Sequence, residues 1–224
     1  MSDKKLKVFI EGGDRNYATL ASNFGEECMN AEEADIVFFT GGADVSPSLY
    51  GEKELSTTHV NPDRDRHEVS LYQRLQLDNK KRAYLGVCRG GQFLNVMNGG
   101  SLWQDVKGHC GDHYAQDMAT KIIYKVSSTH HQQFRVPTPE TKVPFRVLAV
   151  GLDDQMNIKK NTEKFAPSPP PQHDQVDIEA MWYPTTRTLC FQPHPEFPGY
   201  PECKTLFLRY VHDLVIPSLQ KEAV

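Results

Sequence analysis

The sequence lacks long hydrophobic runs and any large excess of charge of one sign. Mean hydropathy over the 224 residues is −0.56, and no apolar run approaches the roughly 20 residues that a membrane-spanning helix needs. The 25 basic and 29 acidic residues give a net charge of −4, which offers no electrostatic reason to expect nucleic acid or a membrane as a partner. The apolar stretch near the N-terminus is too short for a signal peptide, so we expect a cytoplasmic protein.

The sequence also has little cysteine. Its five cysteines are an odd number, widely spaced and without a CxxC pair, which excludes a disulfide framework and a cysteine-rich zinc site. At least one thiol must therefore be free. The five are Cys28, Cys88, Cys110, Cys190 and Cys203.

What is present is an alternation of strand-like and helix-like segments in the first half of the chain. We expect buried strands over 6–10, 35–40 and 82–88, separated and followed by helices over 15–33, 68–79 and 89–98. Strands that alternate with helices pair in parallel and are covered by helices on both faces. The length suits one domain, so we expect a single α/β domain over residues 1–224.

The second half has a different character, because short apolar segments are separated by turn-forming stretches. These segments, 121–128, 145–152, 178–184 and 188–193, predict antiparallel hairpins added beside the parallel sheet. A last amphipathic helix is expected over 202–215, and the proline-rich segment 159–173 is expected to be an exposed loop.

The segment GVCRGG (86–91) places Cys88 between an apolar run and the start of a predicted helix. Glycines around it tolerate a strained turn, as in the nucleophile elbow of hydrolases. A helix N-terminus favours the thiolate, which is the reactive form. The alternative is a buried structural cysteine beside a glycine turn.

A base for this thiol is offered by QPHPEF (192–197), which follows the apolar run of the last predicted strand. His194 and Glu196 are two residues apart in a chain that the flanking prolines hold extended, so their side chains point to the same side. Glu196 could then fix the tautomer of His194 and leave its other ring nitrogen for Cys88. The alternative is an ordinary His/Glu pair on a surface loop.

Taken together, five ordered motifs resemble those of class I glutamine amidotransferases, and more narrowly the γ-glutamyl-γ-aminobutyrate hydrolases of the peptidase C26 group. The chain departs from that pattern at Ser127, where asparagine is usual, and in the segment just before IEA (178–180). Both departures concern the substrate side of the site. The motifs that carry the resemblance are TGGADVSPSLYGE (40–52), RDRHE (64–68), GVCRGGQFLNVMNGGSLWQDV (86–106), SSTHHQ (127–132) and QPHPE (192–196).

The resemblance implies a three-layer, flavodoxin-like fold with a mostly parallel central sheet. It also implies a cysteine-dependent hydrolase that cleaves γ-glutamyl amide bonds through a thioester, without a cofactor. The residues it assigns are a catalytic triad of Cys88, His194 and Glu196, an oxyanion hole from the amides of Gly42 and Arg89, and substrate-binding positions Gln92, Ser128, His130 and His131.

Several alternatives stay open. The protein could act alone on a small γ-glutamyl substrate, deliver ammonia as a glutaminase subunit to a separate synthetase chain, or be a catalytically silent binding protein; a homodimer is also open. RDRHE (64–68) fits either a solvated helix cap or a structural ion pair near the site. We expect no metal site, although the HCxxH spacing of His109, Cys110 and His113 could bind zinc on a loop.

Overall fold

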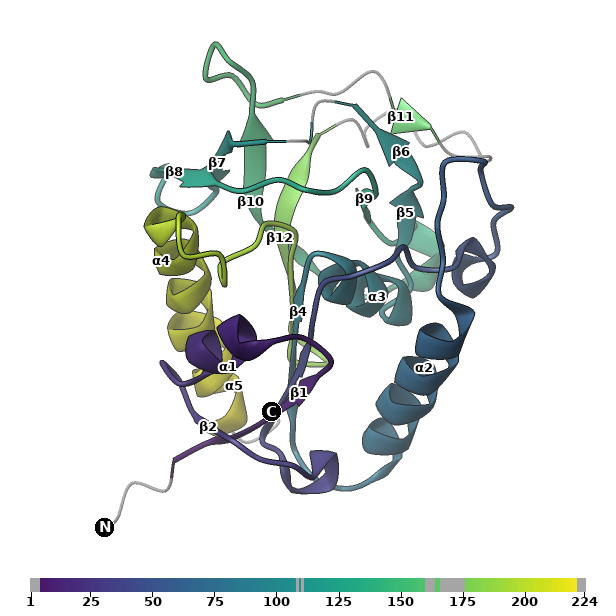
Figure 1. Cartoon of the computed structure of the whole chain (residues 1–224), viewed down its shortest axis with the longest axis vertical. Coiled ribbons are helices and arrows are strands. Elements are labelled where there is room, and N and C mark those ends of the chain that lie inside the picture. Colours follow the sequence, from purple (N-terminus) through teal and green to yellow (C-terminus); the bar gives the residue numbers. More distant parts are fainter. Residues whose placement is uncertain (1–4, 108, 110, 160–163, 166–175, 221–224) are drawn as a thin grey trace.

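The computed structural model describes residues 5–107, 109, 111–159, 164–165 and 176–220. A nine-stranded sheet runs through it in the order β2-β1-β3-β4-β13-β12-β10-β7-β8. Helices cover both faces of this sheet, so the expected three-layer α/β fold is confirmed (Figure 1).

One half of the sheet is parallel. Its strands are β2 (Glu26–Glu27), β1 (Lys7–Glu11), β3 (Ile36–Phe39), β4 (Ala83–Val87) and β13 (Thr188–Phe191). Because β4 and β13 are parallel, with Phe191 opposite Val87, their carboxyl ends meet at the same edge of the sheet. Segments about a hundred positions apart in the sequence are thereby brought side by side.

The other half is antiparallel, as expected for the second part of the chain. It consists of β12 (Ile178–Tyr183), β10 (Arg146–Leu152), β7 (His113–Asp117) and β8 (Ile123–Val126). Two small sheets lie outside it: β5 (Ser101–Trp103) pairs with β9 (Gln133–Arg135), and β6 (Asp105–Val106) pairs with β11 (Lys164–Phe165).

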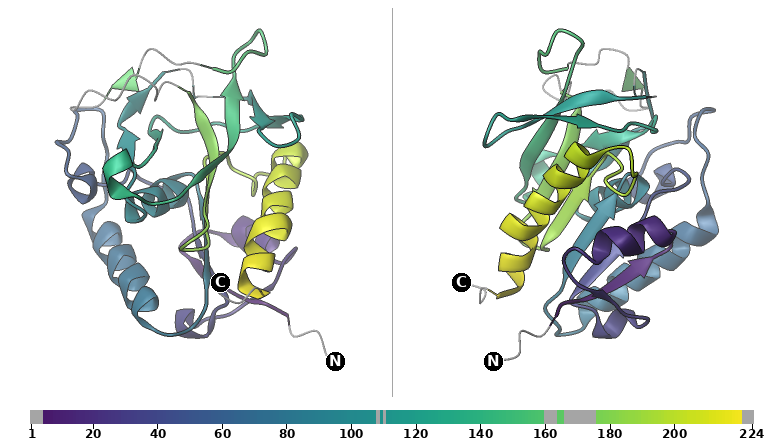
Figure 2. Two further views of the ribbon diagram at one scale, coloured as in Figure 1. Left: turned by 180° about the vertical axis from the view of Figure 1, so that it is seen from behind. Right: turned by 60° about the vertical axis from the view of Figure 1, so that its left-hand side comes forward.

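The helices form two layers, α1, α4 and α5 on one face of the sheet and α2 and α3 on the other (Figures 1 and 2). Successive side chains of the buried strand β3 point to opposite faces of the sheet and so contribute to the hydrophobic core on each face. Phe38 packs with Tyr17 and Phe207 on one face, and Phe39 packs with Phe93 on the other. The helical elements are α1 (Arg15–Ala21), η1 (Ala31–Glu33), η2 (Pro47–Tyr50), α2 (Pro62–Leu77), α3 (Arg89–Met97), η3 (Pro139–Thr141), α4 (Pro201–Tyr210), the π-helical turn η4 (Val211–Val215) and α5 (Ile216–Gln220).

Two expected helices have different bounds. The helix expected over 15–33 is wrong in length: α1 ends at Ala21, where the Asn23 amide donates to the carbonyls of Thr19 and Leu20. Helix α2 begins six residues before the expected position 68, because Asn61 caps it and Pro62 fits the first helical turn.

Two expectations for the second half also need correction. The segment 188–193 does not only extend a hairpin, since β13 pairs in parallel with β4 on its other side. Within the expected loop 159–173, residues 164–165 form β11, and residues 160–163 and 166–173 lie outside the described residues. Among the residues described, no helix is long and apolar enough to cross a membrane.

Close packing of α3 against the sheet gives a first prediction. An alanine Cβ at position 90 would lie 2.2 Å from the carbonyl oxygen of Phe39, which is backbone and cannot turn aside. We expect Gly90→Ala to lower the free energy of unfolding by about 2 kcal/mol, measured by urea denaturation. Gly199→Ala is the matched control, because no described atom beyond Gly199 itself and its two chain neighbours lies within 4 Å of the added Cβ position. Equal effects of the two substitutions would contradict this packing.

Candidate active site

Cys88 lies in a strained turn between β4 and α3. Its backbone has φ 51° and ψ −116°, a positive φ that residues with a side chain rarely adopt. The turn is held from both sides, since the Cys88 amide donates to Phe191 O at 2.8 Å and its carbonyl accepts from Gln92 N at 3.0 Å. The thiol is thus presented at the N-terminus of α3, as expected for a nucleophile elbow.

His194 follows β13 and is fixed through three contacts. Its Nδ1 lies 2.7 Å from Glu196 Oε1, its ring stacks on Phe197, and its backbone N–H donates to Ser127 Oγ at 2.9 Å. With Nδ1 bonded to the carboxylate, Nε2 has no hydrogen-bond partner among the described residues. The free nitrogen is the one that a catalytic base needs.

The same corner of the fold brings His194 and Cys88 together. The Cβ that Gly41 lacks would lie 3.1 Å from His194 Cε1 and 3.8 Å from Cys88 Cβ, so both side chains border one small space. Burial disfavours the imidazolium, but the neighbouring Cys88 side chain and the Glu196 carboxylate outweigh it and raise the pKa of His194 to about 10. The arrangement therefore favours a proton on His194.

The glycine-rich turn after β3 is held by Arg64 of α2. The guanidinium donates to Gly41 O at 2.8 Å and to Thr40 O at 3.0 Å. The peptide bonds of the described residues are trans, so the Gly42 N–H points away from the carbonyl that Arg64 binds. Gly42 itself has φ 147°, which suits glycine, and it lines the same pocket as Cys88.

A buried ion-pair network connects this turn with the nucleophile helix. The Arg89 side chain is 1% exposed and pairs with Asp65 and Glu68 of α2, and Glu68 also accepts from Arg64 Nε at 2.7 Å. Two interpretations of RDRHE were open, a solvated helix cap and a structural ion pair. Asp65 and Glu68 are buried and form structural ion pairs, whereas Arg66 is exposed to solvent. One network thus holds both segments that were expected to supply the oxyanion hole.

A pocket of about 250 Å³ opens beside Cys88. Of the expected substrate-binding residues, Gln92, His130 and His131 line it, whereas Ser128 does not and donates its hydroxyl to His109 O at 2.5 Å. The full lining is Gly42, Ala43, Asp44, His59, Cys88, Gln92, Thr129, His130, His131 and Gln132.

Sequence reasoning missed one charged group in this pocket. Asp44 accepts from His131 Nε2 at 3.0 Å, and this hydrogen bond raises the pKa of His131 despite partial burial. Its position within TGGADVSP, next to the glycines of the expected oxyanion turn, was the available signal. The pocket therefore holds a carboxylate and a basic side chain next to the thiol.

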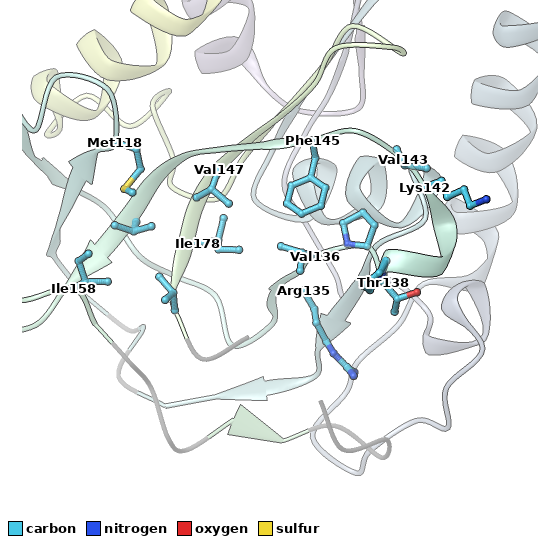
Figure 3. A pocket seen from close by; sticks show the side chains of 14 residues that line it. Met118, Arg135, Val136, Thr138, Lys142, Val143, Phe145, Val147, Ile158 and Ile178 are labelled. Carbon is cyan, nitrogen blue, oxygen red and sulfur yellow. The ribbon is translucent and has the colours of Figure 1, made fainter. Parts of the chain in front are cut away.

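A larger cavity of about 490 Å³ lies elsewhere, between η3 and the strands β10 and β12 (Figure 3). Its walls are mainly apolar, with Met118, Val147 and Ile178 among them, and the described residues that line it include neither histidine nor carboxylate nor thiol. The groups capable of acyl chemistry are gathered at Cys88 instead.

Comparison with known proteins identifies the family of the chain. The sequence profile of peptidase C26 matches residues 25–196, which is more than half of the chain and includes the positions expected to form the triad, Cys88, His194 and Glu196. The chain belongs to the peptidase C26 family. The expected class I glutamine amidotransferase-like membership is thereby confirmed.

Relatives with similar sequences carry related names. The glutamine amidotransferase-like protein YvdE of Lactococcus lactis subsp. lactis is 35% identical over 153 residues, covering 58% of this chain and 61% of YvdE. A Mycobacterium tuberculosis protein named as a glutamine amidotransferase, Rv2859c, is 38% identical over 96 residues, covering 40% of this chain and 30% of its own. This chain thus spans less than two thirds of these relatives.

Solved structures share the fold at low sequence identity. A Thermoplasma acidophilum protein described as part of a GMP synthase superposes with a TM-score of 0.61 at 16% identity, covering 97% of this chain and 98% of its own. A glutamine amidotransferase from Thermotoga maritima gives 0.56 at 12% identity, covering 96% and 91%. These likenesses establish the fold of the C26 protein.

The pKa of His194 gives a prediction about stability. Because its folded pKa of about 10 exceeds the ordinary 6.5, the imidazolium contributes stability that is complete below pH 6.5 and is lost as pH rises towards 10. We expect the stability advantage of the natural protein over His194→Gln to shrink by about 2–4 kcal/mol across that range, measured by urea denaturation at several pH values.

His212→Gln is the control, because His212 is exposed and outside the site. The stability advantage should shrink with pH clearly more for His194→Gln than for this control. Equal changes for the two substitutions would show that no charged pair forms at Cys88.

Proposed function

We propose that this C26 protein is a hydrolase of γ-glutamyl amide bonds with Cys88 as its nucleophile. The observation that carries the proposal is the meeting, at one pocket, of a thiol in a strained elbow with a histidine whose Nδ1 is bound to Glu196. Nucleophile, base and orienting carboxylate are the three parts that thiol acyl transfer requires.

In this mechanism the Cys88 thiolate attacks the γ-carbonyl carbon, and the carbonyl π electrons move to oxygen. The amides of Gly42 and Arg89 donate to that oxyanion, and such donors contribute about 3 kcal/mol each to the transition state. His194 Nε2 gives its proton to the leaving amine as the C–N bond breaks. Water, deprotonated by His194, then cleaves the thioester and releases glutamate and the thiol.

The pocket beside Cys88 suits the other end of a γ-glutamyl group. Asp44 offers a carboxylate to an α-ammonium, and His131, whose pKa is raised, offers a cation to an α-carboxylate. Gln92 is buried in the wall, where its amide donates to Gln132 O at 2.8 Å. We assign these three residues to substrate binding, with His130 as a buried neighbour.

Arg64 serves in this proposal as a positioning residue. It acts by fixing the carbonyls of two consecutive peptide bonds, those of Thr40 and Gly41. Since a trans peptide is rigid, fixing the Gly41 carbonyl also fixes the direction of the Gly42 N–H.

The proposed activity is tested with a panel of γ-glutamyl amines and glutamine, assayed for released amine and glutamate. We expect turnover of at least one compound, a covalent adduct on Cys88 of one γ-glutamyl group in quenched reactions by mass spectrometry, and loss of both in Cys88→Ala. Cys28→Ala is the control, because Cys28 lies outside the pocket.

The other two hypotheses give different outcomes. Activity that is confined to glutamine and depends on an added synthetase chain would show that the protein is a glutaminase subunit and not a stand-alone hydrolase. Turnover retained by Cys88→Ala would overturn the nucleophile assignment, and the absence of both turnover and adduct with every compound would favour a binding protein.

The role of Arg64 is tested by comparing two neighbouring arginines. We expect Arg64→Gln to lower kcat roughly 10- to 100-fold with KM nearly unchanged, because only the transition state carries the oxyanion. Arg66→Gln is the matched control on the same helix, since Arg66 is exposed and pairs only with Asp63 among the described residues. A change in KM alone, or equal effects of both substitutions, would contradict the positioning role.

A further inference from the structure

A second cluster of reactive side chains lies outside the triad. His109, His113 and Glu179 each direct a ligand atom to one place, with these atoms all within 4.8 Å of one another. His109 follows β6, His113 begins β7 and Glu179 is on β12. His109 and Glu179 are 1% and 0% exposed, so bulk water does not form hydrogen bonds with their polar atoms.

His113 and Glu179 form a close buried ion pair, with Nε2 and Oε1 3.0 Å apart. The alignment is poor for a hydrogen bond, so neither atom has a well-directed hydrogen-bond partner in the described part of the chain. The remaining nitrogen of His113 and the remaining oxygen of Glu179 are also without one there. Burying polar atoms without well-directed partners is unfavourable, and a cation between them would remove that cost.

His109 has the arrangement of a supported metal ligand. Its Nε2 lies 2.9 Å from Asp177 Oδ2, which leaves Nδ1 buried and without a hydrogen-bond partner among the described residues. Histidines that bind metals commonly donate their other ring nitrogen to a carboxylate, which fixes the tautomer and the ring orientation.

The backbone leaves room for the cluster. Strand β10 lies between β7 and β12, so Glu179 must reach across it towards His113. At that point β10 carries Gly151, whose missing Cβ would lie 3.1 Å from Glu179 Oε1. A larger residue there would crowd the carboxylate.

The charge of the surroundings also fits a cation. Asp177 and Glu179 supply two carboxylates, and Lys159, which lies 3.3 Å from His109 Nε2 and 3.6 Å from Asp177 Oδ2, is one cation against them. With neutral histidines, the described residues of the cluster carry a net negative charge, which a divalent ion would balance.

We propose that His109, His113 and Glu179 form a binding site for a divalent transition metal of the zinc class. Two imidazole nitrogens and a carboxylate oxygen are ligands that Zn²⁺ accepts, with water in the fourth position. This revises the expectation of no metal site: His109 and His113 of the HCxxH spacing contribute, Glu179 completes the set, and Cys110 lies outside the described residues.

The site is connected by hydrogen bonds to the segment that holds the backbone of His194. Ser128 Oγ donates to His109 O, and the adjacent Ser127 Oγ accepts from His194 N at 2.9 Å. A metal that fixes His109 therefore fixes the loop on which the His194 backbone rests.

The test measures metal binding in the Cys88→Ala protein, because Zn²⁺ could otherwise bind the catalytic thiol and His194. We expect about one Zn²⁺ per chain to remain after gel filtration, measured by inductively coupled plasma mass spectrometry. The protein should also compete with a chromogenic chelator for Zn²⁺. Glu179→Gln and His113→Asn in this background should weaken binding at least 10-fold, and His212→Asn, at an exposed histidine, should not.

Folding of each variant is checked by near-ultraviolet circular dichroism. Should both cluster variants fail to fold, Co²⁺ added to the Cys88→Ala protein still decides, since a four-coordinate nitrogen and oxygen site gives visible absorption bands. Absence of these bands together with no retained Zn²⁺ would overturn the site, as would unchanged binding in folded Glu179→Gln. The readout is independent of hydrolysis, so a failed activity assay leaves this result unaffected.

Discussion

The strained backbone at Cys88 is the constraint on which the rest of the site depends. A positive φ at a residue with a side chain costs of order 1–3 kcal/mol, so the turn persists only where the surroundings force it. Two contacts impose the turn here. The Cys88 N–H donates to the carbonyl of Phe191 at the end of β13, which pairs in parallel with β4, and α3 packs closely against the end of β3. The same pairing delivers the segment after β13, and with it His194, to the edge where the thiol emerges.

A second set of contacts ties the surroundings of the thiol to the two halves of the chain. On the parallel side, Arg64 and Arg89 share Glu68, so the glycine turn and the nucleophile helix are held by one buried network. On the antiparallel side, Ser127 holds the His194 backbone, and the neighbouring residue binds the segment that carries His109. A buried network of ion pairs and hydrogen bonds rigidifies its surroundings, and oriented amides and a fixed imidazole require this rigidity.

Local signals predicted the elements whose causes are local. Short apolar runs beside glycines predicted β1, β3 and β4, and the GVCRGG and QPHPEF segments predicted the turn at Cys88 and the contact of His194 with Glu196. Prediction failed where the cause lies in a side-chain contact or in distant pairing. The end of α1 is set by the Asn23 amide, and the parallel partner of β13 is a strand from the first half of the chain, which periodicity does not reveal.

The sequence by itself therefore determined the alternation of strands and helices, the elbow at Cys88 and the two-residue spacing of His194 and Glu196, because each of these follows from neighbouring residues and backbone geometry. Only the tertiary structure decided that Asp65 and Glu68 are buried partners of Arg89, that Asp44 enters the pocket, and that Glu179 meets His109 and His113. These contacts join residues that lie tens of positions apart in the sequence. The order of the strands in the sheet determines which residues come into contact, and it buries charged side chains beside one another.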